Sequence, residues 1–300
     1  MSVQDEAAPQ ASWRDVVAMV VAAMAFATSG PLGKASSDIP AVVVAAARTG
    51  IAAVVLVAIG PKVLVSALRA LRSRQRAAVV LAGALLAGHF ALFLAGLGAT
   101  SLAAAVALVS LEPIAVVLAA FLAFGVRPTR RELLGLLAAT LGAVIVASGA
   151  GAGEHRLTGD LLVLGCVVLY GAYVASARGL RDAMPPFPYA AAVYGVASLV
   201  LMPFAVVLAV RAPSPPPSQL LAVLAMGLVP TLVGHTLVQR VARRAPPVLV
   251  ALVSPGETVG SLLIGAVVMS TRPSGREAVG CAIVLIGVVL AVTDRLRKRE

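Results

Sequence analysis

The chain is dominated by long apolar runs that are separated by short polar links. About 20 apolar residues in a helix are enough to cross the hydrocarbon core of a bilayer. With 300 residues, of which 60% are hydrophobic and only 12% charged, the chain has too few charges for a water-soluble domain. Strands of a membrane β-barrel would alternate polar and apolar residues, and these runs do not. The sequence therefore predicts an all-α, polytopic membrane protein.

Ten of the runs are long enough to span a membrane. Gly, Pro and charged residues mark their ends, as at Gly60-Pro61-Lys62 and Pro215-Pro216-Pro217. The predicted spans are 16–33, 39–60, 77–98, 101–125, 132–151, 159–178, 188–210, 219–239, 247–270 and 276–294.

The Lys and Arg residues predict the orientation. If the N-terminus is cytoplasmic, most of the 24 basic residues fall on the cytoplasmic side, and the cytoplasmic loops of membrane proteins carry such an excess. The outer side receives only Lys34, Arg156, Arg211, Arg272 and Arg276. We therefore expect a multi-pass protein of the cell (cytoplasmic) membrane with both termini in the cytoplasm. The net charge of +11 is then a topology signal, and nucleic acid is not an expected partner.

The two halves of the chain resemble each other. Glu112, Arg127-Pro128, Arg131-Glu132 and Gly135 are repeated, at the same spacing, as Glu257, Arg272-Pro273, Arg276-Glu277 and Gly280. Five spans per half is an odd number, so the second copy must enter the membrane from the opposite side. The sequence thus predicts two inverted five-helix repeats, 16–151 and 159–294. A cytoplasmic tail, 1–15, precedes them, and a basic cytoplasmic tail, 295–300, follows them. Inverted repeats are typical of secondary transporters with a central site.

Three ionisable residues are predicted at similar depth. At a helical rise of about 1.5 Å per residue, Arg48 lies about 14 Å into its span, Glu112 about 16 Å and Glu257 about 15 Å. Charged groups at bilayer depth are costly and normally face a protected cavity. We therefore expect one polar chamber between the halves.

Each of these residues has a functional and a structural interpretation. Arg48 either forms an ion pair with Glu112 or receives a carboxylate-bearing solute through a bidentate contact. Glu112 and Glu257 either couple transport to protons or another cation, or are neutral helix-packing groups. For Glu257, the neighbouring Thr258 and Ser261 offer such packing partners.

Two prolines lie beside the glutamates. Pro113 removes the amide that would bond the Val109 carbonyl, and Pro255 does the same for Ala251. We expect both helices to kink or open there, which would expose carbonyl groups to the chamber.

Other polar residues are weaker candidates. His89 and His235 are either packing groups or part of a relay. Tyr170 and Tyr173 either line a solute path or pack. Cys166 and Cys281 lie in apolar runs without metal-binding spacing, so we interpret them as small buried hydrophobes and predict no metal and no cofactor.

Several of these motifs resemble those of a known family. Ser110-Leu111-Glu112-Pro113 in the fourth span, Ala46-Ala47-Arg48-Thr49-Gly50 in the second, and Arg131-Glu132-Leu133-Leu134-Gly135 at the start of the fifth resemble the EamA domains of the drug/metabolite transporter superfamily. The resemblance covers about residues 15–294. The Leu-Glu-Pro signature is closest to the threonine/homoserine exporter branch. The chain departs from the family pattern at Gly125-Val126 and Ser270-Thr271, where members often carry Gly-Glu, and at Ser29, where Trp is usual.

The resemblance implies a ten-helix secondary transporter that exports an amino acid or a similar small polar metabolite by alternating access. Its expected partners are the lipid bilayer, the solute and, if transport is coupled to them, protons. The predicted solute-binding residues are Arg48, Glu112, His89, Tyr170 and Tyr173, and Glu257 and His235 complete the cavity. Drug efflux or lipid flipping by the same fold is the alternative. A membrane enzyme on lipid-linked substrates would need clustered Asp or His pairs, which the sequence lacks. The oligomeric state stays open.

Overall fold

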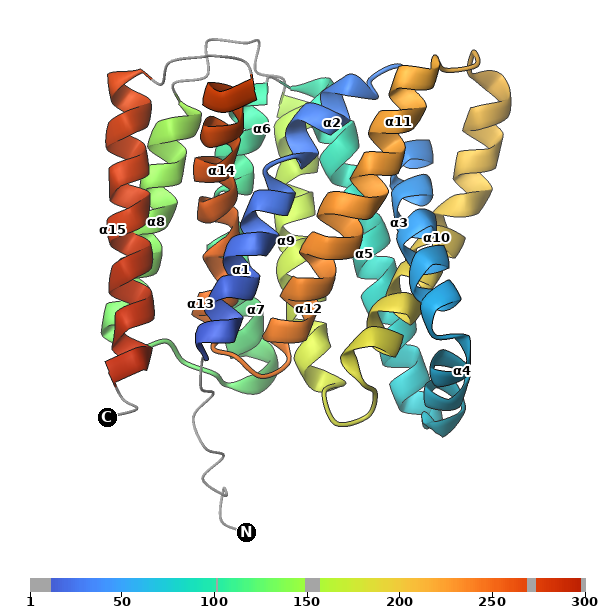
Figure 1. Ribbon diagram of the computed structural model, residues 1–300, viewed down its shortest axis with the longest axis horizontal. Helices are drawn as coiled ribbons and strands as arrows, with labels where there is room; N and C mark the ends of the chain where they lie inside the picture. Colours follow the sequence, from blue (N-terminus) through green and yellow to red (C-terminus); the bar gives the residue numbers. More distant parts are fainter. Residues whose placement is uncertain (1–11, 101, 149–156, 269–273, 298–300) are drawn as a thin grey trace.

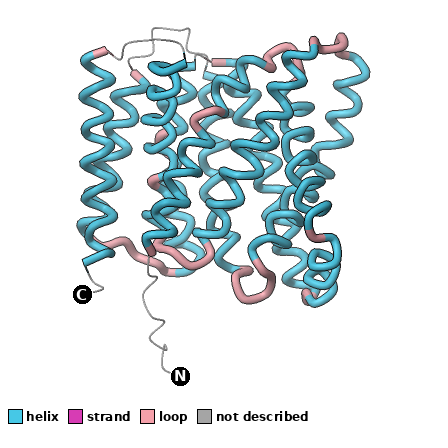
Figure 2. The backbone as a smooth tube through the Cα atoms, viewed as in Figure 1, coloured by secondary structure: helices cyan, strands magenta, loops and turns pink. Residues whose placement is uncertain are grey.

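The protein is a bundle of helices. The computed structural model describes residues 12–100, 102–148, 157–268 and 274–297, and these contain helices, turns and loops but no strand. Figure 1 shows the long helices standing side by side, with α1 (Trp13–Phe26) beginning and α15 (Gly275–Arg297) ending at the same end of the bundle. The connecting loops gather at the two ends (Figure 2).

The bounds of the remaining helices follow the predicted spans closely, with several spans broken into two pieces. In the first half they are α2 (Ser29–Ala35), α3 (Ala41–Ile59), α4 (Pro61–Ala70), α5 (Ser73–Ala99), α6 (Leu102–Val109), α7 (Glu112–Phe124) and α8 (Arg130–Ala147). In the second half they are α9 (Leu157–Gly179), α10 (Pro186–Arg211), α11 (Pro217–Met226), the π-helix η1 (Gly227–His235), α12 (Thr236–Ala242), α13 (Pro247–Ala251) and α14 (Val253–Val268).

Nine helical segments in the described part of the chain are long and apolar enough to cross a membrane. The predicted span that has no counterpart among these nine is the fifth, 132–151; it corresponds to α8, whose 18 residues begin with Arg130, Arg131 and Glu132. These charges shorten its apolar stretch. Several predicted features lie outside the described residues: the end of that span (149–151), the end of span nine (269–270), the repeated Arg272-Pro273 pair, most of the N-terminal tail (1–11) and half of the C-terminal tail (298–300).

Helix α4 was not predicted. The sequence interpretation treated residues 61–76 as a basic cytoplasmic link, but Pro61 occupies the first turn of a helix, where its missing amide costs nothing. None of its residues is buried. The exposed apolar side chains of Val63 and Val65 accompany Lys62 and Arg69, a combination typical of helices that lie at a membrane–water interface.

The closest helix pair is α8 and α15, which stand together at one edge of the bundle (Figure 1). Glycines allow their backbones to touch. A Cβ atom added at Gly142 would lie 2.7 Å from the Gly280 carbonyl oxygen, and one at Gly287 would lie 2.6 Å from the Gly135 carbonyl oxygen. The pairing of 135 with 287 and of 142 with 280 makes the two helices antiparallel. Small residues serve this purpose at many membrane helix interfaces.

The first span is interrupted between α1 and α2, and three further spans are interrupted near their middle, each beside a proline. The fourth breaks between α6, which ends at Val109, and α7, which begins at Glu112. The ninth breaks between α13 and α14, three residues before Pro255. In the eighth, Pro230 lies inside the π-helix η1. Proline removes an amide from the helical ladder, so each break leaves polar backbone inside the bundle.

The glycine pairing predicts a site-specific loss of stability. Gly142→Ala should lower the free energy of unfolding by about 1–3 kcal/mol, because the new methyl group meets the backbone of α15, which cannot rotate away. Gly195→Ala is the matched control, because a Cβ there has no atom within 4 Å. Thermal unfolding of the purified protein in detergent measures both. Equal midpoints for the two variants would contradict the close contact of α8 with α15.

Candidate functional site

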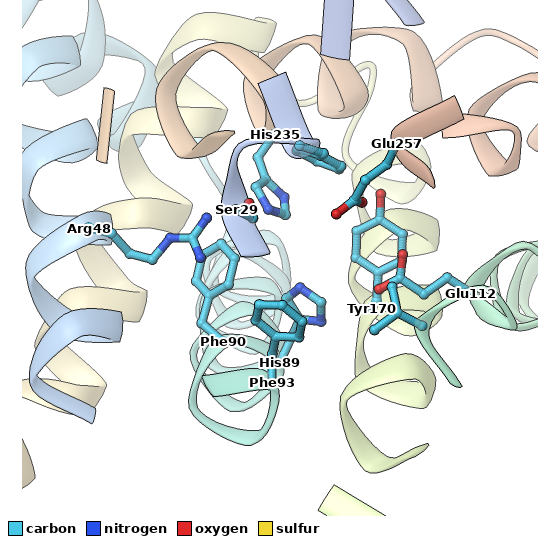
Figure 3. Close-up of a pocket in the computed structure, with 11 residues that line it drawn as sticks. Ser29, Arg48, His89, Phe90, Phe93, Glu112, Tyr170, His235 and Glu257 are labelled. Atoms are coloured by element: carbon cyan, nitrogen blue, oxygen red, sulfur yellow. The ribbon is translucent and has the colours of Figure 1, made fainter. Parts of the chain in front are cut away.

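A small polar cavity lies where the interrupted helices meet. It is lined by Phe26, Ser29, Arg48, His89, Phe90, Phe93, Val109, Glu112, Tyr170, His235 and Glu257. Figure 3 shows Arg48 on one side and the two glutamates on the other, with the histidines between. The room for centres of water-sized molecules is ≈ 30 Å³, enough for only about two waters. In this conformation the cavity is too small for a metabolite.

Arg48 is held by two contacts. Its side chain projects from α3 and is 1% exposed. Its Nε donates a 2.8 Å hydrogen bond to Oγ1 of Thr231 in η1, and the guanidinium carbon lies 3.9 Å from the centre of the Phe90 ring on α5. A cation over an aromatic face is attracted to the ring. These contacts orient the guanidinium and leave its terminal nitrogens toward the cavity (Figure 3).

The π-helix explains why Thr231 is available to Arg48. Pro230 has no amide to donate to the Met226 carbonyl. The Thr231 hydroxyl donates to that carbonyl instead, at 2.8 Å, and at the same time accepts from Arg48. Tyr194 supports the segment, since its hydroxyl donates to the Thr231 carbonyl at 3.2 Å. One proline thus leads to a widened turn and a fixed hydroxyl at the cavity wall.

The two glutamates occupy different environments. Glu112 begins α7, is buried, and accepts a 2.6 Å hydrogen bond from the Ser254 hydroxyl at the start of α14. Glu257 projects from α14 toward the cavity and has no hydrogen-bond partner among the described residues (Figure 3). The side chains proposed as its partners bond elsewhere: Thr258 to the Ser254 carbonyl at 3.4 Å and Ser261 to the Ala27 carbonyl at 3.3 Å. Glu112, not Glu257, is therefore the glutamate that a hydroxyl satisfies.

The structural interpretation of Arg48 as the ion-pair partner of Glu112 is wrong for this conformation. In the described part of the chain Arg48 bonds to Thr231, and Glu112 bonds to Ser254. The reason is geometric, since the two residues lie on opposite sides of the cavity (Figure 3).

The histidines and Tyr170 fill the space between the charges. The rings of His89 and His235 have their centres 6.0 Å apart, and Tyr170 lies 5.1 Å from His89. Within the described residues, the buried Tyr170 hydroxyl and the His235 Nδ1 have no hydrogen-bond partner. Burying a polar group without a hydrogen-bond partner costs free energy. Both atoms are therefore available to form hydrogen bonds with a solute that enters the cavity.

Three of the predicted site residues lie outside the cavity lining. Tyr173 is one turn beyond Tyr170, and its hydroxyl accepts a bond from Gln239 instead. Pro113 and Pro255 are each beside a glutamate-bearing break but do not line the cavity. The remaining predicted residues, Arg48, His89, Glu112, Tyr170, His235 and Glu257, all do.

Sequence reasoning missed Thr231, Ser254 and Ser29. Thr231 follows Pro230 in an apolar run, and that proline was a usable signal. Ser254 is the last residue of Val250-Ala251-Leu252-Val253-Ser254, which repeats Val106-Ala107-Leu108-Val109-Ser110. Chance similarity between apolar runs explains this short match, and it gave no hint of the bond to Glu112.

The two halves are joined by a polar contact near each end of the bundle. At the end where α1 begins, Arg244 and Asp15 form an ion pair of 2.8 Å. At the other end, Gln219 on α11 donates a 2.6 Å bond to Asp38, between α2 and α3. A second cavity of ≈ 320 Å³ lies beside this contact and is lined by Lys34, Asp38 and residues of α5.

These features define a class of protein: a helical membrane protein whose halves enclose a polar chamber. Comparisons with known proteins identify the group. The EamA-like transporter family matches the chain twice, over residues 13–148 and 157–293. The chain therefore belongs to the EamA-like transporter family. Each match overlaps nearly all of one predicted repeat, 16–151 or 159–294.

Solved structures share the fold. One, described only as the crystal structure of a protein, superimposes with a TM-score of 0.80 at 22% sequence identity, covering 97% of this chain and 100% of that one. At this identity the likeness extends to the fold alone. The search of curated proteins gives no significant match.

The Arg48–Thr231 bond predicts a difference between two small substitutions. Thr231→Val removes the hydroxyl and leaves the Arg48 Nε without its acceptor, so the free energy of unfolding should fall by roughly 1–3 kcal/mol. Thr231→Ser keeps the hydroxyl and should stay near wild type. Thermal unfolding in detergent distinguishes them. If the valine variant is as stable as the serine variant, Thr231 does not hold Arg48.

Proposed function

We propose that the protein is a secondary active transporter that exports an amino acid, or a similar small polar metabolite, across the cytoplasmic membrane by alternating access. The observation that carries this proposal is the separation of charge in the central cavity. Arg48 forms one wall, and Glu112 and Glu257 form the other (Figure 3). A zwitterion presents the complementary charges.

Each end of such a solute has a suitable partner. A guanidinium binds a carboxylate through two parallel hydrogen bonds, and Arg48 is already oriented by Thr231 and Phe90. Glu257, which has no partner among the described residues, is the acceptor for an ammonium group. The Tyr170 hydroxyl and the His235 Nδ1 supply further unpaired polar atoms.

The proposed architecture is ten membrane helices in two inverted repeats, 16–151 and 159–294, with α8 as the fifth span. The antiparallel contact of α8 with α15 supports inversion, because the glycines that meet, Gly135 with Gly287 and Gly142 with Gly280, belong to equivalent helices of the two halves. Both termini are cytoplasmic on the distribution of basic residues. The Asp15–Arg244 contact is then at the inner end and the Asp38–Gln219 contact at the outer end.

These two contacts support a gating scheme. Both connect the first half of the chain to the second, and the cavity between them has room for only about two waters. We infer from these features an occluded conformation. Release of the inner contact would admit solute from the cytoplasm, and release of the outer contact would deliver it to the ≈ 320 Å³ cavity beside Lys34.

Proton coupling follows from the imbalance of charge in the cavity. A single guanidinium faces two carboxyl groups, and apolar surroundings do not tolerate an uncompensated charge. One carboxyl group is therefore best accommodated with a proton. Glu112 is assigned this role, because Glu257 faces the solute.

The alternatives are drug efflux and lipid flipping by the same fold. Both would favour a cavity lined mainly by apolar and aromatic groups, and Phe26, Phe90 and Phe93 are such groups. The charged walls favour a small polar solute instead, as in the threonine/homoserine exporters. A membrane enzyme is disfavoured, because family members are transporters.

Neutralising Arg48 tests the solute site. Arg48→Gln should reduce amino-acid counterflow in proteoliposomes by roughly tenfold or more, the loss expected for a charged hydrogen-bonded pair. Arg211→Gln makes the same chemical change at an exposed helix end and should leave counterflow unchanged. Chromatography of the solubilised variants verifies that both still fold. Counterflow at the wild-type rate in Arg48→Gln would remove Arg48 from the transport mechanism.

Neutralising Glu112 tests proton coupling. Glu112→Gln has no group to titrate, so accumulation driven by an imposed pH gradient should be lost, while counterflow without a gradient continues. Asp182→Asn, at an exposed position, is the control and should keep both activities. Measurement of solute uptake with and without the gradient separates the two effects. Full dependence on the gradient in Glu112→Gln would exclude Glu112 as the coupling group.

A further inference from the structure

Three metal-binding side chains converge on one wall of the central cavity. They are His89 on α5, Glu112 on α7 and Cys166 on α9, and all three are buried. One ligand atom from each residue lies within 4.8 Å of the other two. The imidazole Nδ1 of His89 is 3.2 Å from the Cys166 Sγ.

The spacing is close to that of a tetrahedral site. Zinc binds nitrogen at about 2.0–2.1 Å and sulfur at about 2.3 Å, so two such ligands lie roughly 3.5 Å apart around one ion. The nitrogen–sulfur pair already has this spacing. The widest separation in the group has to shorten by about 1 Å, which the Glu112 side chain can supply by rotating away from Ser254.

The donor set also fits the chemistry and the surroundings. A neutral imidazole, a thiolate and a carboxylate together favour a borderline-soft divalent cation such as Zn²⁺. Their two negative charges cancel the charge of the ion, so the loaded site is neutral, as an apolar interior requires. Binding releases the thiol proton of Cys166 and, where present, the proton of Glu112 to the solvent.

The site opens onto the cavity. His89 and Glu112 both line it, whereas Cys166 lies behind them and bonds through its carbonyl to the His89 ring, 3.2 Å away. Three protein ligands leave the fourth tetrahedral position for water or solute. The same geometry without metal is a helix-packing arrangement, in which His89 Nδ1–H donates to that carbonyl. Metal binding requires His89 to present the lone pair of Nδ1 to the ion.

We propose that His89, Glu112 and Cys166 bind a thiophilic divalent cation of the Zn²⁺ type, and that the bound cation blocks solute transport by filling the cavity that His89 and Glu112 line. The second part rests on the proposed transport function, and the first does not. Cys166 has no part in the solute mechanism, so the two activities can be separated by substitution.

Cobalt titration of the full-length protein in detergent tests binding directly. Wild type should bind one equivalent of Co²⁺ with a thiolate-to-cobalt charge-transfer band. Cys166→Ser should abolish the band, and His89→Ala should weaken binding by at least roughly tenfold. Cys281→Ser is the matched control, because Cys281 lies on α15 away from the cluster, and it should keep the full band. A wild-type protein without stoichiometric binding, or a band that depends on Cys281, overturns the proposal.

A second experiment uses only the wild-type protein, so its result does not depend on whether the variants fold. Cys166 is buried, so a maleimide reaches it only when the protein opens transiently, for example on warming. Zn²⁺ should slow this labelling of Cys166 and leave the labelling of the more exposed Cys281 unchanged, as detected by mass spectrometry of the labelled peptides. Equal labelling of Cys166 with and without Zn²⁺ refutes the site.

Counterflow provides the functional arm. Zn²⁺ should inhibit wild type and Cys281→Ser but spare Cys166→Ser, which keeps its basal transport. Equal inhibition of all three places the inhibitory metal elsewhere and overturns the second part of the proposal. If no solute shows counterflow in wild type, the transport function fails and the inhibitory part fails with it, whereas the cobalt and alkylation results still decide the metal site.

Discussion

The burial of one guanidinium constrains the whole structure. Arg48 is 1% exposed in a helix that is otherwise apolar, and a charge in that position requires partners from neighbouring helices. Thr231 supplies a hydroxyl because Pro230 widens its helix, and Phe90 supplies an aromatic face. The contacts of Arg48 therefore draw together α3, α5 and η1, one of which belongs to the second half of the chain.

The cost of burying charge also explains the wall of the cavity opposite Arg48. Helices broken beside Pro113 and Pro255 bring Glu112 and Glu257 to one wall, and the Ser254–Glu112 bond joins the two breaks. A cavity with one cation and two carboxylates carries an excess negative charge, which a proton or a cationic group can neutralise. The proposed solute and the proposed metal ion each bring a positive charge to this wall, and they occupy the same cavity.

Much of this could be predicted from the sequence because membrane helices are long and apolar and because buried charges are rare. The span positions and the cavity residues Arg48, Glu112 and Glu257 follow from those two facts. The two repeats follow from the repeated Glu-Arg-Pro series, and the other three predicted cavity residues are polar groups in apolar runs. The partners could not be predicted. Which hydroxyl meets Arg48 or Glu112 depends on how distant helices rotate, and Thr231 is 183 residues from Arg48. The contact between His89 and Cys166 depends in the same way on the packing of α5 against α9. Nothing in the sequence indicates this contact, so Cys166 was interpreted only as a small buried hydrophobe.

The central claim is that the cavity recognises a solute by opposite charges at its two ends. Counterflow of labelled amino acids by the wild-type protein in proteoliposomes, competed by size-matched analogues that lack either the amino or the carboxyl group, tests it most directly. The account predicts that the zwitterion competes and that each single-charge analogue competes at least roughly tenfold less well, since each loses one charged pair. Equal competition by all three, or by an uncharged analogue, would contradict it.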